Sequence, residues 1–170
     1  EDQQKKDREG MKAIVINDRY INDMQRNIEA MCLSLLTKQQ PVARDLRMVS
    51  AALKVVTDIE RVGDHVSDIA ELLLRMDMPD LSVFSDSLPK MIIATKKIVC
   101  EAVESFVARD IEDARDVIAY DDVIDDYFNQ VKEDLIADLK TGKENPDDCV
   151  DALMLAKYLE RIGDHASNIA

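Results

Sequence analysis

The chain has 170 residues, of which 46% are hydrophobic and 34% are charged, so it can bury a core, and its composition excludes disorder. Its net charge of −13 opposes binding to nucleic-acid phosphates and to anionic lipid, but it suits cations or a basic protein surface. With only four Gly, four Pro and no Trp, the remaining composition favours helices.

Three widely spaced cysteines, Cys32, Cys100 and Cys149, form no metal or redox motif. Their odd number predicts reduced, small apolar side chains in a cytoplasmic protein. No apolar run approaches the roughly 20 residues of a membrane span, so we expect no direct membrane insertion. The chain begins without Met and ends within a motif, which predicts a fragment or an ordered portion of a longer protein.

Helical periodicity runs through most of the chain and strand alternation is absent, which predicts five helices. The first covers residues 3–38, and a connection ending at Pro41 follows it. The second covers residues 42–76. Its expected buried seam consists of Leu46, Val49, Leu53, Val56, Gly63, Val66 and Ala70.

Turn-forming residues without helical period predict a linker over residues 78–87. The third helix is expected to start with Ser87 as its N-cap and to end near Arg109. The fourth runs from Asp110 to Gly142, where glycine suits a C-cap with positive φ. The fifth opens at Asn145, an N-cap followed by proline at the first helical position.

The chain contains a tandem duplication. Residues 60–70, Glu-Arg-Val-Gly-Asp-His-Val-Ser-Asp-Ile-Ala, recur at 160–170 with eight of eleven positions identical. We therefore predict an elongated all-α fold of two similar three-helix bundles, one in residues 1–77 and one in residues 88–170. The first repeat has two helices and lacks a counterpart of the third, so we expect an exposed apolar groove there unless another segment or subunit fills it.

What recurs is a stripe of side-chain oxygens on one helix face, and the preceding helix of each repeat carries a second, shorter stripe. Antiparallel packing of the two helices could bring the stripes together. Oxygen ligands suit hard or borderline divalent cations. The predicted metal ligands are Asp18, Asn22, Glu60, Asp64 and Asp68 in the first repeat, and Asp121, Asp125, Glu160, Asp164 and Asn168 in the second.

The alternative interpretation of these stripes is a solvated helix face, on which Arg61 and Arg161 neutralise part of the charge. The duplication favours metal binding, because a solvated face does not need the same acids twice. His65 and His165 lie off the stripes and are predicted to pack or hydrogen-bond. Gly63 and Gly163, in mid-helix, predict a close approach of neighbouring helices.

Three segments together resemble the PhoU family of bacterial and archaeal phosphate-uptake regulators: the twin Glu-Arg-x-Gly-Asp-His phrases, Asp18-x-x-Ile-Asn22, and Gln40-Pro-Val-Ala-Arg44-Asp-Leu-Arg47. The resemblance implies paired three-helix bundles, often dimeric, whose acidic motifs bind metal in some members. Fe, Zn, Mg, Mn and Ni are not distinguished. Asn22 and Asn168 depart from the family pattern, because they place neutral amides where carboxylates are expected.

The same resemblance implies a cytoplasmic, non-enzymatic adaptor. It would link the ATPase subunit of the phosphate ABC transporter to a phosphate-sensing histidine kinase and restrain uptake and the starvation response. A PhoU-like regulatory domain of a sodium–phosphate cotransporter is an alternative. A carboxylate-bridged metalloenzyme is a weaker one, because the Glu-x-x-His pairs of di-iron bundles are absent, His65 following Glu60 by five.

Overall fold

The computed structural model describes the whole chain except residues 1, 39–41 and 78, so the connection at Pro41 lies outside the described residues. The described residues contain no strand, and the predicted all-α fold is confirmed. The elements in chain order are α1 (Asp2–Lys38), α2 (Ala43–Arg75), the short 3-10 helix η1 (Leu81–Val83), α3 (Ser87–Ala108), α4 (Ile111–Thr141) and α5 (Pro146–Ile169).

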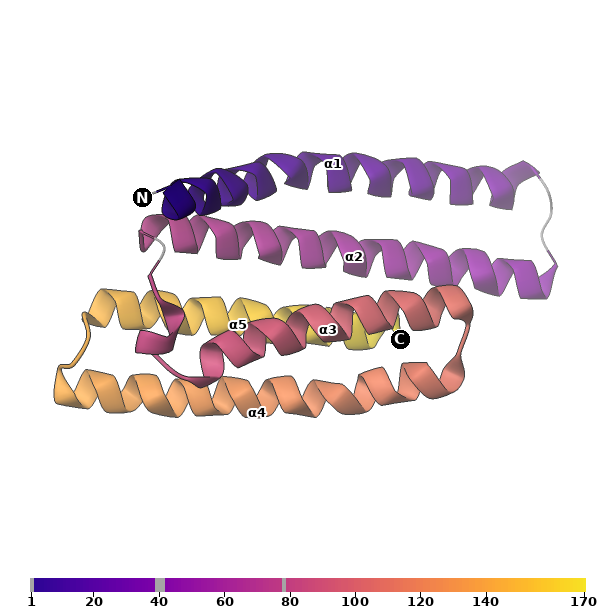
Figure 1. Cartoon of the computed structure of the whole chain (residues 1–170). Helices are drawn as coiled ribbons and strands as arrows, with labels where there is room; N and C mark the ends of the chain where they lie inside the picture. The colour runs from indigo at the N-terminus through magenta and orange to yellow at the C-terminus, as the bar shows by residue number, and fades with distance from the viewer. Residues whose placement is uncertain (1, 39–41, 78) are drawn as a thin grey trace.

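The five long helices run roughly along one direction and form an elongated molecule (Figure 1). In the first repeat α1 packs on α2, whereas in the second α3, α4 and α5 pack on one another as a three-helix bundle. The repeats meet where α2 packs on α5. Within each repeat the paired helices α1 and α2, or α4 and α5, are antiparallel.

Capping residues define the ends of the last two helices. The Asp110 carboxylate accepts hydrogen bonds from the backbone N–H groups of residues 112 and 113, at 2.9 and 3.2 Å. The Asn145 side chain accepts one from residue 147 at 3.0 Å, with Pro146 in the first helical turn. Gly142 closes α4 with φ of 66°. These three predictions are confirmed, and each rests on local chemistry.

Ser87 is not the N-cap of α3, so that prediction is wrong. Ser87 is already the first helical residue, and its backbone N–H donates to the hydroxyl of Ser85 at 3.1 Å. The Ser85 hydroxyl in turn donates to Asp134 of α4, which anchors this end of α3 on its neighbour. Within the predicted linker, Asp80 caps η1 by accepting from the backbone of Ser82 at 3.0 Å.

The second repeat has the better-buried core. Ile98 of α3, Ile124 of α4 and Leu155 of α5 are fully buried. In the seam predicted for α2, Val56 is buried as expected, but Leu46 is 46% exposed, so its predicted burial is wrong. Among the described residues, no helix equivalent to α3 packs on α1 and α2 to cover it.

Large apolar side chains remain exposed on α1. Ile16, Tyr20 and Met24 are 71%, 66% and 45% exposed and recur every fourth residue, so they share one face of the helix. The two-helix repeat exposes apolar side chains, as predicted, whereas the groove predicted there stays a prediction. In the second repeat α3 packs on the corresponding pair (Figure 1), and the counterparts of Tyr20 and Met24, Val123 and Tyr127, are half-buried there, whereas Ala119, the counterpart of Ile16, is exposed.

Candidate metal centres between paired helices

The first cluster consists of Asp18 and Asn22 on α1 with Glu60 and Asp64 on α2. Along α1, the Asn22 amide donates a hydrogen bond to Asp18 Oδ2 at 3.2 Å, while Asp18 Oδ1 is buried without a hydrogen-bond partner. The two helices bring these side chains close enough to interact across the pair, as the sequence predicted.

The pKa of Glu60 reflects the negative charge of the first cluster. Burial raises its pKa, and the carboxylates of Asp64, Asp18 and Glu29 raise it further. Arg61 opposes this shift. Its guanidinium lies 3.2 Å from Asp64 and 3.7 Å from Glu60, but its side chain is 57% exposed, so it screens the cluster from the solvent edge. The cluster therefore favours a further positive charge.

The second cluster consists of Asp121 and Asp125 on α4 with Glu160 and Asp164 on α5. Burial raises the pKa of both aspartates on α4. Asp164 and Asp125 raise that of Asp121 further, and Glu160 and Asp164 raise that of Asp125. Burial also raises the pKa of Asp164, with Glu160 as the next cause. Four carboxylates thus converge from two helices.

A lysine that the sequence reasoning missed enters the second cluster. Lys157 Nζ lies 2.6 Å from Glu160 Oε1, and the Glu160 side chain is only 15% exposed. The other Glu160 oxygen, Oε2, is buried without a hydrogen-bond partner. The sequence contained a signal for this contact, because a lysine three residues before a glutamate lies on the same face of a helix. A comparison of the two repeats would also have singled out Lys157, because the first repeat has Thr57 at the equivalent position.

Two glycines let the paired helices approach at the clusters, as predicted. A Cβ on Gly163 would lie 2.8 Å from Asp121 Oδ1 and 3.1 Å from Ile124 Cδ1. A Cβ on Gly63 would lie 3.0 Å from Ile21 Cδ1. Any larger residue at 163 would therefore displace a candidate ligand directly, which makes this glycine part of the second cluster's construction.

Asp68 and Asn168 point toward other partners. The Asp68 carboxylate lies 3.7 Å from His65 Nδ1, and the Asn168 amide nitrogen lies 3.5 Å from the Asp58 carboxylate. Each step of four residues along a helix rotates the side chain by about 40°. By the third member of each stripe this rotation has turned the side chain toward the contact between α2 and α5.

The two histidines lie at that contact between the repeats. The rings of His65 and His165 have centroids 5.7 Å apart. His165 Nδ1 is 2.9 Å from Asp58, a carboxylate only 2% exposed, while His65 lies 5.5 Å from the ring of Tyr158. Asp58 and Tyr158 occupy the same repeat position, so the contacts are related by the duplication. The prediction that each histidine packs or hydrogen-bonds is confirmed, because His165 hydrogen-bonds to Asp58 and His65 packs against Tyr158.

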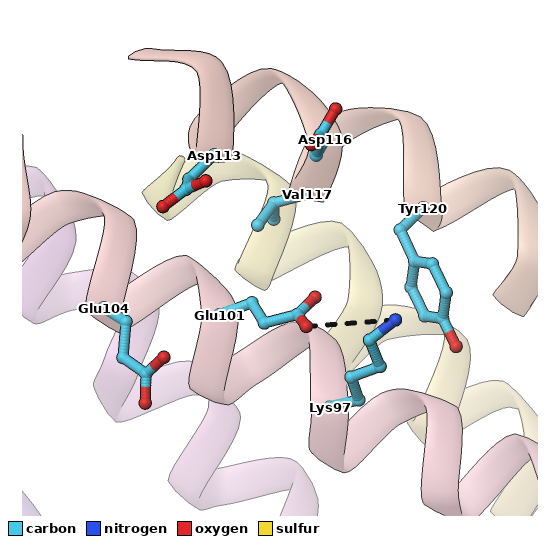
Figure 2. Close-up of a pocket in the computed structure, with 7 residues that line it drawn as sticks. All are labelled: Lys97, Glu101, Glu104, Asp113, Asp116, Val117 and Tyr120. Atoms are coloured by element: carbon cyan, nitrogen blue, oxygen red, sulfur yellow. Dashed lines mark ion pairs between the residues drawn. The ribbon is translucent and has the colours of Figure 1, made fainter. Parts of the chain in front are cut away.

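A separate polar pocket of about 340 Å³ lies between α3 and α4 (Figure 2). Lys97 spans it, with Nζ 3.8 Å from Glu101 and 4.1 Å from the centre of the Tyr120 ring. Its other lining residues are Glu104, Asp113, Asp116 and Val117. This pocket includes none of the predicted metal ligands.

The fold and the twin clusters define a tandem helical-repeat protein with an acidic seam in each repeat. Residues 3–73 and 88–170 match the PhoU domain, and the chain belongs to the PhoU family. It is 32% identical over 167 residues to a Clostridium acetobutylicum protein named as a phosphate-specific transport system accessory protein PhoU homolog, covering 98% of this chain and 76% of that protein. It is 33% identical over 172 residues to homolog 1 from Methanothermobacter thermautotrophicus, with coverages of 96% and 75%.

Solved structures agree. The crystal structure of PhoU from Pseudomonas aeruginosa superposes with a TM-score of 0.90 at 29% identity, covering 98% of this chain and 80% of that one. The phosphate transport system regulatory protein PhoU from Streptococcus pneumoniae gives a TM-score of 0.86 at 27% identity, with coverages of 97% and 77%. Among the residues described, no helix is both long and apolar enough to span a bilayer.

The two clusters fit a divalent cation by their chemistry. Their donors are oxygens, and each cluster contains a buried carboxylate oxygen without a hydrogen-bond partner. Burial, followed by repulsion from neighbouring carboxylates, raises the pKa of Glu60 in the first cluster and of Asp125 in the second. In the described part of the chain, however, no three His, Cys, Asp or Glu side chains are already arranged to hold one ion. The carboxylates are neighbours that would have to close around a metal.

Proposed function

We propose that this chain is a non-enzymatic regulator of phosphate uptake and of the phosphate-starvation response, whose two clusters bind divalent or iron-type metal ions. The observation that carries the proposal is the convergence of carboxylates from paired helices in both repeats of a PhoU-family fold. Relatives named as accessory proteins of the phosphate-specific transport system support the regulatory role.

Metal at the clusters would have a structural or sensing role. Asp18, Glu60 and Asp64 would hold it in the first repeat, with Asn22 as a neutral ligand. Asp121, Asp125, Glu160 and Asp164 would hold it in the second. When bound, the ion would neutralise the repelling carboxylates, so each cluster would join its two helices instead of pushing them apart.

The proposed partners are the ATPase subunit of the phosphate ABC transporter and a phosphate-sensing histidine kinase. Long helices with exposed apolar side chains, such as Ile16 and Tyr20 on α1, offer surface for such contacts. We also propose a homodimer. Co-purification of the tagged protein from its host, followed by sedimentation of the pure protein, tests both proposals.

Deletion and complementation in the native host test the regulatory function. Deletion should derepress a phosphate-starvation reporter in phosphate-rich medium, and the wild-type gene should restore repression. Normal repression in the deletion strain contradicts the proposal. Complementation by an Asp64→Ala/Asp164→Ala variant separates the role of metal, because it should restore repression poorly while accumulating to the wild-type level.

A further inference from the structure

Lys157 is built into the second cluster from both of the helices that form it. Its ammonium lies 2.6 Å from Glu160 on its own helix and 5.3 Å from the centre of the Phe128 ring on α4. Its side chain is 40% exposed, so the long stem also has a path to solvent. The positive charge thus sits on the buried carboxylate that is the longest arm of the cluster.

The first repeat has neither half of this arrangement. Thr57 stands where the second repeat has Lys157, and its hydroxyl donates to the backbone carbonyl of Leu53 at 3.0 Å. Gln25 stands where the second repeat has Phe128, and its amide donates to Glu29 at 3.1 Å. The same helix pairing forms without the lysine and its ring, so the fold of a repeat does not require them.

An ammonium and a divalent cation on the same carboxylate repel each other, and they compete for the same oxygen lone pairs. We propose, on the basis of the metal-binding function proposed above, that Lys157 is the resident counter-ion of the second cluster. It competes with metal for Glu160 and lowers the affinity of that cluster. A metal ion binds there only when the lysine swings away toward solvent.

The test replaces Lys157 by threonine, the residue that the first repeat has at the equivalent position. The Lys157→Thr substitution is made in an Asp64→Ala background, which disables the first cluster. Calorimetric titration with Mn²⁺ should show an affinity at least about tenfold higher than that of the Asp64→Ala parent. In metal-free buffer the thermal midpoint should fall, because Glu160 loses its partner, and saturating Mn²⁺ should restore it. Lys157→Arg should keep the parent's affinity.

Lys97→Thr is the matched control. Lys97 also pairs with a glutamate and lies over an aromatic ring, but it spans the separate pocket between α3 and α4 (Figure 2). Its loss should leave Mn²⁺ affinity unchanged. A gain equal to that of Lys157→Thr would attribute the effect to overall charge and overturn the inference.

The remaining outcomes separate the two proposals. Bound Mn²⁺ with the same affinity in Lys157→Thr and its parent overturns the role of the lysine and leaves metal binding intact. No Mn²⁺ bound by any variant, including the protein with both clusters intact, overturns the metal-binding function and the inference with it.

Discussion

The two repeats share a sequence pattern and a helix pairing, but they differ in what covers them. In the second repeat, Val117, Ile124 and Val131 are at most 1% exposed, because α3 completes the bundle. Their counterparts in the first repeat, Ile14, Ile21 and Ile28, are only half-buried. The sequences of the two paired helices are therefore sufficient for their pairing, whereas burial of the apolar seam between them depends on a third helix.

The two acidic clusters also differ, in the charged side chains that surround their carboxylates. Both bring acids from paired helices together and both keep the repeated arginine, Arg61 or Arg161, but the first has Asn22 and Thr57 where the second has Asp125 and Lys157. The duplication preserved the positions of the carboxylates on α2 and α5 and changed the charges around them. We therefore expect two metal sites of unequal affinity.

The largest expected effect is on the core. Ile124→Ala should lower the free energy of unfolding by about 2–5 kcal/mol, because it opens a cavity in a fully buried seam. Ile21→Ala should cost about half as much, because less of its apolar surface is buried. Urea titrations of both variants measure this difference. Equal costs would mean that the first repeat is covered as completely as the second.

A smaller loss is expected where the helices approach most closely. Gly163→Ala should destabilise by about 1–3 kcal/mol, because the new Cβ would meet Asp121 and Ile124. Gly10→Ala is the control. Its Cβ would have no neighbour within 4 Å, so the better helix propensity should stabilise by about 0.5–1 kcal/mol. Thermal denaturation measures the stability of both variants. Stabilisation by Gly163→Ala would contradict the close approach of α4 and α5 at this position.

The smallest effect concerns pH. Burial and neighbouring acids raise the pKa of Asp125, so native protein binds its proton more tightly than unfolded protein does. Its stabilising contribution is present below its ordinary pKa of 3.8 and is lost as pH rises through the raised value. Asp125→Asn, which copies Asn22, should therefore make the metal-free protein more stable at about pH 7.

The same variant should show a flatter loss of stability as pH rises from about 4 to about 7. Thermal midpoints across this range, measured in chelator, provide the test, with Asp80→Asn as the control. The pKa of Asp80 is lowered by its hydrogen bonds to Ser82, so this substitution should act in the opposite direction. A midpoint for Asp125→Asn that tracks wild type throughout would show that repulsion in the second cluster does not affect folding.

Local signals predicted most of the fold. Asp110 and Asn145 begin helices and Gly142 ends one where expected, because caps depend on neighbouring residues alone. The pairing of the stripes could be predicted from the duplication and from antiparallel helix packing. The exposure of Leu46 could not be predicted, because burial depends on which elements lie opposite a side chain.

Features at the contact between the repeats were also beyond sequence reasoning. Asp58 and Tyr158 occupy equivalent positions but differ in chemistry, so comparing the repeats gave no sign that each would face a histidine. The turn of Asn168 toward Asp58 is of the same kind. Helix geometry predicts the rotation along the stripe, but the partner that Asn168 meets depends on the packing of α2 on α5, which no local pattern specifies.

Metal stoichiometry of protein purified without chelator tests the central claim most directly. Wild type should carry metal in both repeats, Asp64→Ala should lose that of the first cluster, Asp164→Ala that of the second, and the double variant should carry none. Equal metal content in wild type and the double variant, with all proteins folded, would contradict the assignment of these carboxylates as ligands.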